Sequence, residues 1–111
     1  MWLLDINIPA QVGTVLRSLN VPFKFAANQG WGRLTNGALV AAAHGTGFTC
    51  ILTKDVRFDA AAEKALKQFP ILSIVRLALP QSPGKKYAEA FRVAWEKSPI
   101  VPSPGKLLIW P

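Results

Sequence analysis

Short apolar runs and helical stripes alternate along the whole chain. The first run begins at Trp2 and ends abruptly at Asp5. The other four runs cover residues 21–25, 48–53, 71–79 and 106–110. Continuous apolar runs of this length are typical of strands that are buried on both faces, as in a parallel sheet. The pattern therefore predicts four or five strands, with Asp5 at the carboxyl end of the first and residues 106–110 as the optional last strand.

The segments between these runs carry the spacing of amphipathic helices. Between residues 9 and 19 the apolar positions recur at i, i+3, i+4 and i+7, namely at Val12, Val15, Leu16 and Leu19. Similar stripes predict three more helices, the first capped by Thr35 or Asn36, the second capped by Asp59, and the third following Gly84. Alternating strands and helices predict a three-layer α/β/α sandwich with a mostly parallel sheet of four or five strands.

Length and composition bound the class of protein. A chain of 111 residues, half of them hydrophobic, fits one domain spanning residues 1–111 with a real core. No stretch approaches the ~20 apolar residues of a membrane span, and no charged segment precedes the first run as in a secretory signal. The single cysteine, Cys50, excludes an internal disulfide. We therefore expect a reduced, cytoplasmic setting and no membrane partner.

The charge balance favours an anionic partner. Thirteen Lys and Arg residues against six Asp and Glu residues give a net charge of +7, which suits nucleic acid or an acidic protein segment. The basic residues are scattered, so a surface that only confers solubility is the alternative.

The last predicted strand, residues 106–110, is expected at a sheet edge, where an apolar strand is either covered or pairs with another chain. A homodimer is one expectation for that edge.

Carboxylates at strand ends are the main chemistry that the sequence offers. Asp5 and Asp55 each follow a buried run, and ligands of open α/β sheets bind outside the carboxyl ends of the strands. For Asp5, capping of the following helix is an equally good explanation. The chain has no glycine-rich phosphate loop, and one cysteine and one histidine exclude the usual structural zinc site. The remaining option is a hard cation such as Mg²⁺, held by one or two carboxylates.

Three segments together resemble a known family. Residues 3–9, Leu-Leu-Asp-Ile-Asn-Ile-Pro, resemble the Leu-Leu-Asp-Glu-Asn-Leu-Pro opening of a PIN-like domain family that is grouped with toxin–antitoxin nucleases. Gly30 and Trp31, followed by residues 34–39, are similar to a Gly-Trp…Leu-Thr-Asn-Gly-Glu-Leu segment of one branch. Residues 51–55 resemble its Leu-Leu-Thr-x-Asp strand end. The resemblance spans roughly residues 2–79, in the same order and spacing.

The resemblance implies a metal-dependent nuclease. PIN-type enzymes bind Mg²⁺ or Mn²⁺ through three or four acids and cut RNA, often as toxins that an antitoxin neutralises. Asp5 and Asp55 match two retained acids and would hold the metal. Asn36 stands where an acid often begins the second helix and would assist with a neutral oxygen.

The chain also departs from the family pattern. Ile6 and Ala38 replace two glutamates, and neither side chain can coordinate a metal. Arg57 replaces a second acid of the third motif, and Asp59 lies nearby as an auxiliary acid. Fewer acids imply a weaker metal site.

Three basic residues are expected on the rim of the same site. Arg57 either contacts a phosphate, for which guanidinium is well suited, or fills the vacated metal position with a fixed positive charge. Arg33 and Lys54 flank the same rim and would also bind substrate phosphates. The alternative is that all three are solvated loop residues.

Two functions are therefore expected, and a third is less favoured. The first is a PIN-like metal-dependent ribonuclease, the toxin of a toxin–antitoxin pair, with a depleted acidic site. The second is a catalytically inactive PIN-like module that binds RNA or a partner protein, such as an antitoxin. A phosphatase is less favoured because no nucleophile motif is present.

Overall fold

Five short strands form one parallel sheet in the computed structural model, which describes residues 1–111. The strands are β1 (Trp2–Leu4), β2 (Phe23–Phe25), β3 (Cys50–Thr53), β4 (Ser73–Leu77) and β5 (Leu107–Trp110). Their order across the sheet is β2-β1-β3-β4-β5, and every neighbouring pair is parallel. The predicted parallel sheet is confirmed, and the expected edge position of the last strand is confirmed with it.

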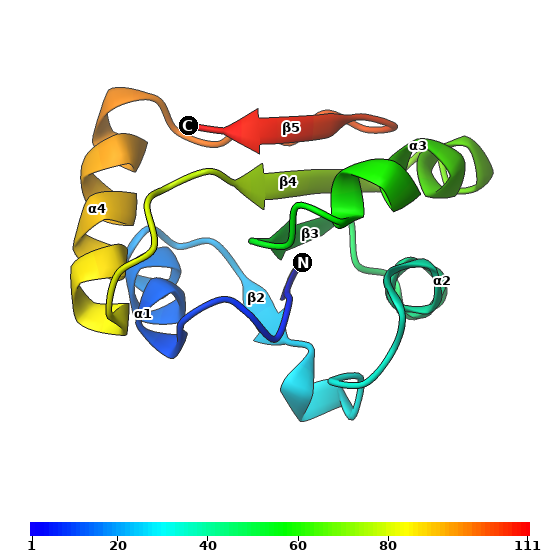
Figure 1. Ribbon diagram of the computed structural model, residues 1–111, viewed down its shortest axis with the longest axis horizontal. Coiled ribbons are helices and arrows are strands. Elements are labelled where there is room, and N and C mark those ends of the chain that lie inside the picture. The colour runs from blue at the N-terminus through cyan, green and yellow to red at the C-terminus, as the bar shows by residue number, and fades with distance from the viewer.

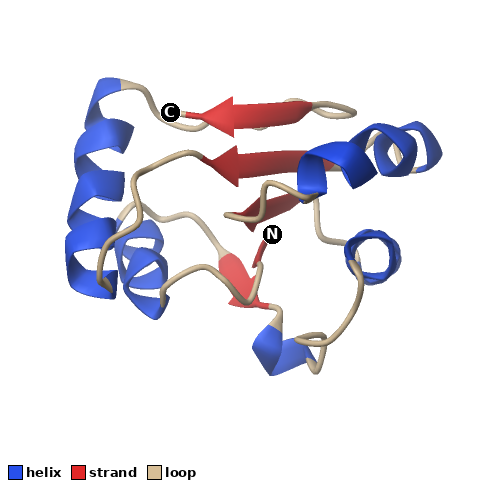
Figure 2. Cartoon of the chain, viewed as in Figure 1, coloured by secondary structure: helices blue, strands red, loops and turns tan.

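Four α-helices cover the two faces of this sheet (Figure 1, Figure 2). The helices are α1 (Ala10–Ser18), α2 (Asn36–Thr46), α3 (Phe58–Gln68) and α4 (Gly84–Lys97), with a short 3₁₀ helix η1 (Ala27–Gln29) after β2. Figure 1 shows α1 beside α4 at one side of the sheet and α2 beside α3 at the other. The α/β/α layering predicted from the sequence is therefore present. No helix combines the length and the apolar character that a membrane crossing requires.

The core is divided by the sheet into two halves. Successive strand residues point to opposite faces, so Leu3 and Ile51 pack under α2 and α3, whereas Leu4 and Leu52 pack under α1 and α4. All four residues of β3 are buried, which explains why its sequence shows no polar alternation. The central strands are thus anchored from both sides, and their carboxyl ends are held in fixed positions.

The helix starts agree with the sequence in one case and differ in another. The Thr35 hydroxyl caps α2 by accepting a hydrogen bond from the backbone N–H of Ala38, as expected. The predicted cap by Asp59 is wrong. The chain already turns at residues 55–58, where the carbonyl of Asp55 accepts the N–H of Phe58, so Asp59 lies inside the first turn of α3.

The last crossover has a handedness that no sequence pattern indicates. The β1–α1–β2 unit and the β4–α4–β5 unit step across the sheet in opposite directions, yet both helices lie on the same face. Two crossovers that step in opposite directions with their helices on the same face have opposite handedness. Parallel crossovers are right-handed in the great majority of cases, so the β4–α4–β5 unit is the exception here. The first residue of α4, Gly84, approaches α1 so closely that an added Cβ would overlap the Gln11 side chain.

Candidate functional site

A cleft opens where the sheet changes the direction of its connections. From β1 the chain continues to one edge of the sheet, and from β3 it continues toward the other, so the carboxyl ends of these neighbours flank a topological switch point. Asp5 follows β1 directly, and Asp55 follows β3 by two residues. Both acids line the same cleft of about 540 Å³, together with Asn36 from the start of α2. The structure thus brings together the two acids that the sequence suggested as metal ligands and the amide that was expected to assist them.

The Asp5 carboxylate is buried and held by three donors. Only 7% of the surface of Asp5 is exposed. Oδ1 accepts the backbone N–H of Ile6 at 2.8 Å, and Oδ2 accepts the hydroxyl of Thr53 at 2.7 Å and the amide of Asn7 at 3.4 Å. A buried carboxylate needs such partners, because burial without hydrogen bonds is costly. The three donors therefore restrain the orientation of this carboxylate, which lines the cleft.

Thr53 and Asn7 also tie together the loops after β1 and β3. The Thr53 hydroxyl oxygen accepts the backbone N–H of Asp55 at 3.1 Å, and the side-chain oxygen Oδ1 of Asn7 accepts the backbone N–H of Lys54 at 3.0 Å. Neither residue is evident as a site residue from the sequence. The signal that would have revealed Thr53 is register: Leu4 pairs with Leu52, so the next positions place Thr53 beside Asp5.

Asp55 is engaged on one of its two oxygens. Oδ1 accepts the backbone N–H of Arg57 at 2.9 Å and its Nε at 3.1 Å. Hydrogen bonding from Arg57 holds the pKa of Asp55 below its usual value, and the Asn36 side chain adds to the effect. The Arg57 side chain is 86% exposed, so this ion pair is screened by water and weak. An incoming cation or phosphate can displace the guanidinium at little cost.

Lys54 lies on the wall of the cleft in a half-enclosed setting. Its ammonium group lies 4.3 Å from the ring centre of Tyr87 and donates a hydrogen bond to Gln81. Partial burial lowers the pKa of Lys54. The Tyr87 hydroxyl is buried without a hydrogen-bond partner, and burial raises the pKa of Tyr87 to about 12. Gln81, which lies between β4 and α4, was not identified from the sequence.

Two residues predicted for the site lie elsewhere. Arg33 is exposed and does not line the cleft, although its neighbours Gly32 and Leu34 do. Asp59 faces Arg76 on β4, with 2.7 Å between Oδ1 and Nε, and lines a different cavity. The expected auxiliary acid is thus neutralised by a partly buried arginine on the α3 side of the sheet.

The donor set of the cleft suits a hard divalent cation. Carboxylate and amide oxygens are the ligands that Mg²⁺ and Mn²⁺ prefer, and Mg²⁺ commonly takes one or two carboxylates and completes its shell with water and phosphate oxygens. Asp5, Asp55 and Asn36 supply such oxygens from three elements. Nowhere do three or more His, Cys, Asp or Glu residues gather in a metal-binding group. The residues fit a sparsely coordinated ion that depends on its substrate for further ligands.

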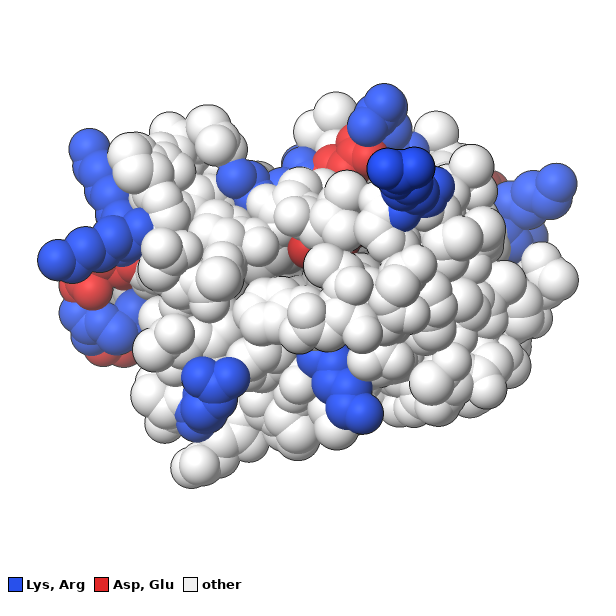
Figure 3. Space-filling view, turned by 90° about the horizontal axis from the view of Figure 1, so that it is seen from below, with Lys and Arg blue, Asp and Glu red and all other residues white.

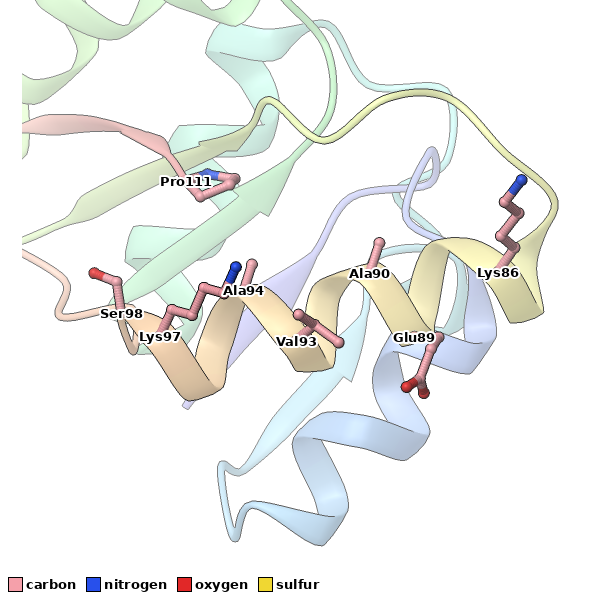
Figure 4. Close-up of a pocket in the computed structure, with 8 residues that line it drawn as sticks. All are labelled: Lys86, Glu89, Ala90, Val93, Ala94, Lys97, Ser98 and Pro111. Carbon is pink, nitrogen blue, oxygen red and sulfur yellow. The ribbon is translucent and has the colours of Figure 1, made fainter.

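The face seen from below carries basic groups in several separate places. In Figure 3 some Lys and Arg side chains lie beside acidic ones at the left edge and near the top, and a small acidic area is recessed in the middle. A second cavity, of about 550 Å³, follows the outer side of α4. Figure 4 shows that it is apolar at Ala90 and Val93, with Lys86 and Lys97 at opposite ends. It brings no set of reactive groups together, so the cleft at the switch point is the stronger site.

Comparison of the chain with protein-family models, with curated proteins and with solved structures finds no match.

Proposed function

We propose that this protein is a metal-dependent ribonuclease of PIN-like type with a reduced acidic site. The observation that carries the proposal is the meeting of Asp5 and Asp55 in one cleft at the switch point of a parallel sheet. Ligand sites of open α/β sheets occur at this place. The buried network around Asp5 supports it further, because such a network prevents the carboxylate from turning away.

The side chains of the cleft have distinct roles in this proposal. Asp5 and Asp55 would hold Mg²⁺ or Mn²⁺, with Asn36 as a neutral oxygen donor. When bound, the ion would supply charge stabilisation at a phosphodiester and lower the pKa of a bound water. Thr53 restrains the Asp5 carboxylate through its hydrogen bond to Oδ2. Lys54 would neutralise a phosphate of the bound RNA strand.

Arg57 fits the proposal as a phosphate ligand that rests on Asp55 when no substrate is present. Its guanidinium is exposed and bonded to a single carboxylate oxygen through Nε, so rotation of the side chain frees both groups. Guanidinium recognises phosphate in a bidentate manner. The exchange would leave Asp55 available to the metal at the moment at which RNA enters.

The proposal extends to a toxin neutralised by an antitoxin, on the strength of the resemblance described above. The net charge of +7 is compatible with RNA and with an acidic antitoxin segment.

A second candidate function is an RNA-binding module without catalysis. The observation that favours it is the ion pair between Arg57 and Asp55, which places a permanently charged guanidinium beside one of the two acids in the absence of a ligand. In this case the cationic rim would bind the RNA backbone and no metal would be needed.

Cleavage of RNA by the purified protein distinguishes the two candidates. We expect cleavage with Mn²⁺ or Mg²⁺, none with a chelator, and none after Asp5→Asn or Asp55→Asn. Glu63→Gln is the matched control, because Glu63 is an exposed acid of α3 whose ion pair with Lys67 is also exposed. Salt-sensitive RNA binding without cleavage would instead favour the module.

A further inference from the structure

One edge of the sheet is open to an additional strand. Figure 1 shows β5 at the top of the sheet with no further strand beside it. The opposite edge strand, β2, carries the exposed Lys24 at its centre, and a charge of this kind protects an edge against pairing. β5 has no charged residue between Lys106 and Pro111, so its edge lacks this protection.

The free backbone groups of β5 belong to Leu107 and Ile109. The carbonyl groups of Lys106 and Trp110 accept backbone N–H groups from β4 and from the residue that follows it, so these two residues face β4. Because the backbone groups of alternate residues point to opposite sides of a strand, those of Leu107 and Ile109 face away from the sheet. No loop or turn bonds to them. Each copy of β5 thus has two N–H and two carbonyl groups left for an external partner.

A groove lies between α3 and β5 on one face of this edge. The cavity there has a volume of about 460 Å³, and Leu66 of α3 and Leu107 of β5 both line it. Its charged lining residues include Glu63 and Lys67, which form an ion pair with each other. Ile109 lies on the same face of β5 as Leu107, and it is 50% exposed. The edge therefore has an exposed apolar side chain and a groove beside it.

We infer that β5 pairs in an antiparallel manner with β5 of a second copy of this chain, with Leu108 of one strand opposite Leu108 of the other. Residues 107 and 109 of the two copies then form two hydrogen-bonded pairs, each of which exchanges two N–H···O bonds. All the free backbone groups of both strands are satisfied, and the two five-stranded sheets become one continuous sheet.

The same register fits the side chains. Ile109 lies opposite Leu107 of the second copy at a Cα separation of about 5.5 Å, and the two side chains lie on the same face. Since Leu107 lines the groove, the exposed isoleucine of each copy lies at the groove of the other. Each copy thus supplies one apolar side chain and receives one. This reciprocity favours a second copy over an isolated strand of another protein.

The charge of the chain does not oppose this pairing at the strand itself. Lys106 lies opposite Trp110 of the second copy, so the two copies of Lys106 lie at opposite ends of the paired strands. At a rise of ~3.4 Å per residue they are about 14 Å apart along the strand, which exceeds the screening length of about 8 Å at physiological salt. The net charge of +7 on each copy still causes repulsion in dilute buffer, so added salt should strengthen the association.

Sedimentation equilibrium of the purified protein measures this association. We expect a monomer–dimer equilibrium in the micromolar range, because the pairing strand has only 4 residues. Ile109→Lys should weaken dimerisation at least about tenfold, since each dimer loses two apolar contacts. Val56→Lys is the matched control, because it adds the same charge at an exposed residue of the loop between β3 and α3 and should leave dimerisation unchanged. Circular dichroism verifies that both variants are folded.

A cysteine at the centre of β5 tests the register. Leu108→Cys places two thiols opposite each other on Cα atoms about 4.5 Å apart, within the ~4.4–6.8 Å that disulfides span. Mild oxidation should therefore give a covalent dimer. Ile109→Cys is the control, because its two Cα atoms lie about 8 Å apart in this register, too far for a disulfide. The native Cys50 is buried and should not contribute.

The inference fails if the wild type is a monomer at every concentration, a result that would leave the β5 edge to a strand of another protein. A dimer that Ile109→Lys does not weaken, or a disulfide formed by Ile109→Cys and not by Leu108→Cys, would also overturn it. Association that disappears in high salt would indicate bridging by a polyanion and would overturn it as well. None of these results depends on cleavage of RNA, so this inference and the proposed function are tested separately.

Discussion

Replacing Thr53 by valine tests whether the buried network organises the cleft. Valine has nearly the same shape as threonine, so the substitution removes one hydroxyl and leaves the packing of β3 largely intact. That hydroxyl donates to the Asp5 carboxylate at 2.7 Å and accepts the N–H of Asp55 at 3.1 Å, and the residue is fully buried. The variant therefore leaves a buried carboxylate and a backbone amide each short of one partner.

The expected loss of stability follows from these contacts. A hydrogen bond to a charged group contributes about 1.5–3 kcal/mol, and an unsatisfied amide costs about 1 kcal/mol more. The additional buried methyl group of valine returns about 0.8 kcal/mol. We expect the free energy of unfolding to fall by about 2–3 kcal/mol, a large part of the ~5–15 kcal/mol that stabilises a typical domain.

Urea unfolding followed by tryptophan fluorescence measures this loss. Thr53→Ser is the matched control, because it retains the hydroxyl and removes a buried methyl group at a cost of about 1 kcal/mol. We expect valine to destabilise the protein more than serine does, and to weaken Mn²⁺ binding more than serine does. If valine proves as stable as the wild type, or more stable than serine, the network does not hold Asp5 as described.

Three further predictions concern single groups. Tyr87 is the one tyrosine of the chain, so the ultraviolet absorbance of tyrosinate should show its pKa near 12 in the folded protein and near 10 in denaturant. Because the unfolded chain loses this proton first, the free energy of unfolding should fall as the pH rises from about 10 to 12. Ionisation of Tyr87 near pH 10 in the folded state would contradict its burial. Cys50 is buried and burial raises its pKa to about 12, so a thiol reagent should modify it only after the protein unfolds. Rapid modification of the native protein would contradict the burial of Cys50. Arg57→Gln should tighten Mn²⁺ binding by no more than about fivefold, because the exposed ion pair that competes for Asp55 is weak. The same substitution should weaken RNA binding and make its salt dependence shallower. If the affinity for Mn²⁺ falls instead, Arg57 does not compete for Asp55.

Hydrophobic periodicity, together with capping and breaking residues, was sufficient to predict the five strands and the four α-helices of this fold, but not the short helix η1. Both faces of β3 are covered, so its residues up to Leu52 are apolar and the polar Thr53 comes only at its carboxyl end. The stripes of α1 and α3 mark the faces that pack on the sheet. Periodicity does not report which face of the sheet a helix covers. The opposite-handed crossover through α4 depends on packing between α1 and α4, and it was therefore not predictable.

The candidate site was predictable only where chemistry coincides with a strand end. Asp5 and Asp55 follow buried runs, and the parallel topology then brings them to one edge of the sheet. The partners of these acids depend on register and side-chain direction. Thr53 meets Asp5 across 48 positions of sequence, and Asp59 turns to Arg76 across 17, and no local pattern encodes either pairing.

Calorimetric titration of Mn²⁺ into the wild type and into Asp5→Asn tests the central claim most directly, since both acids must act on the same ion. Thermal unfolding verifies that each variant is folded, and Glu63→Gln serves as the control for the loss of one negative charge. We predict binding of a single ion by the wild type and by Glu63→Gln, and none by Asp5→Asn. Absence of binding by the wild type, or equal binding by the wild type and Asp5→Asn, would contradict a metal site formed by Asp5 and Asp55.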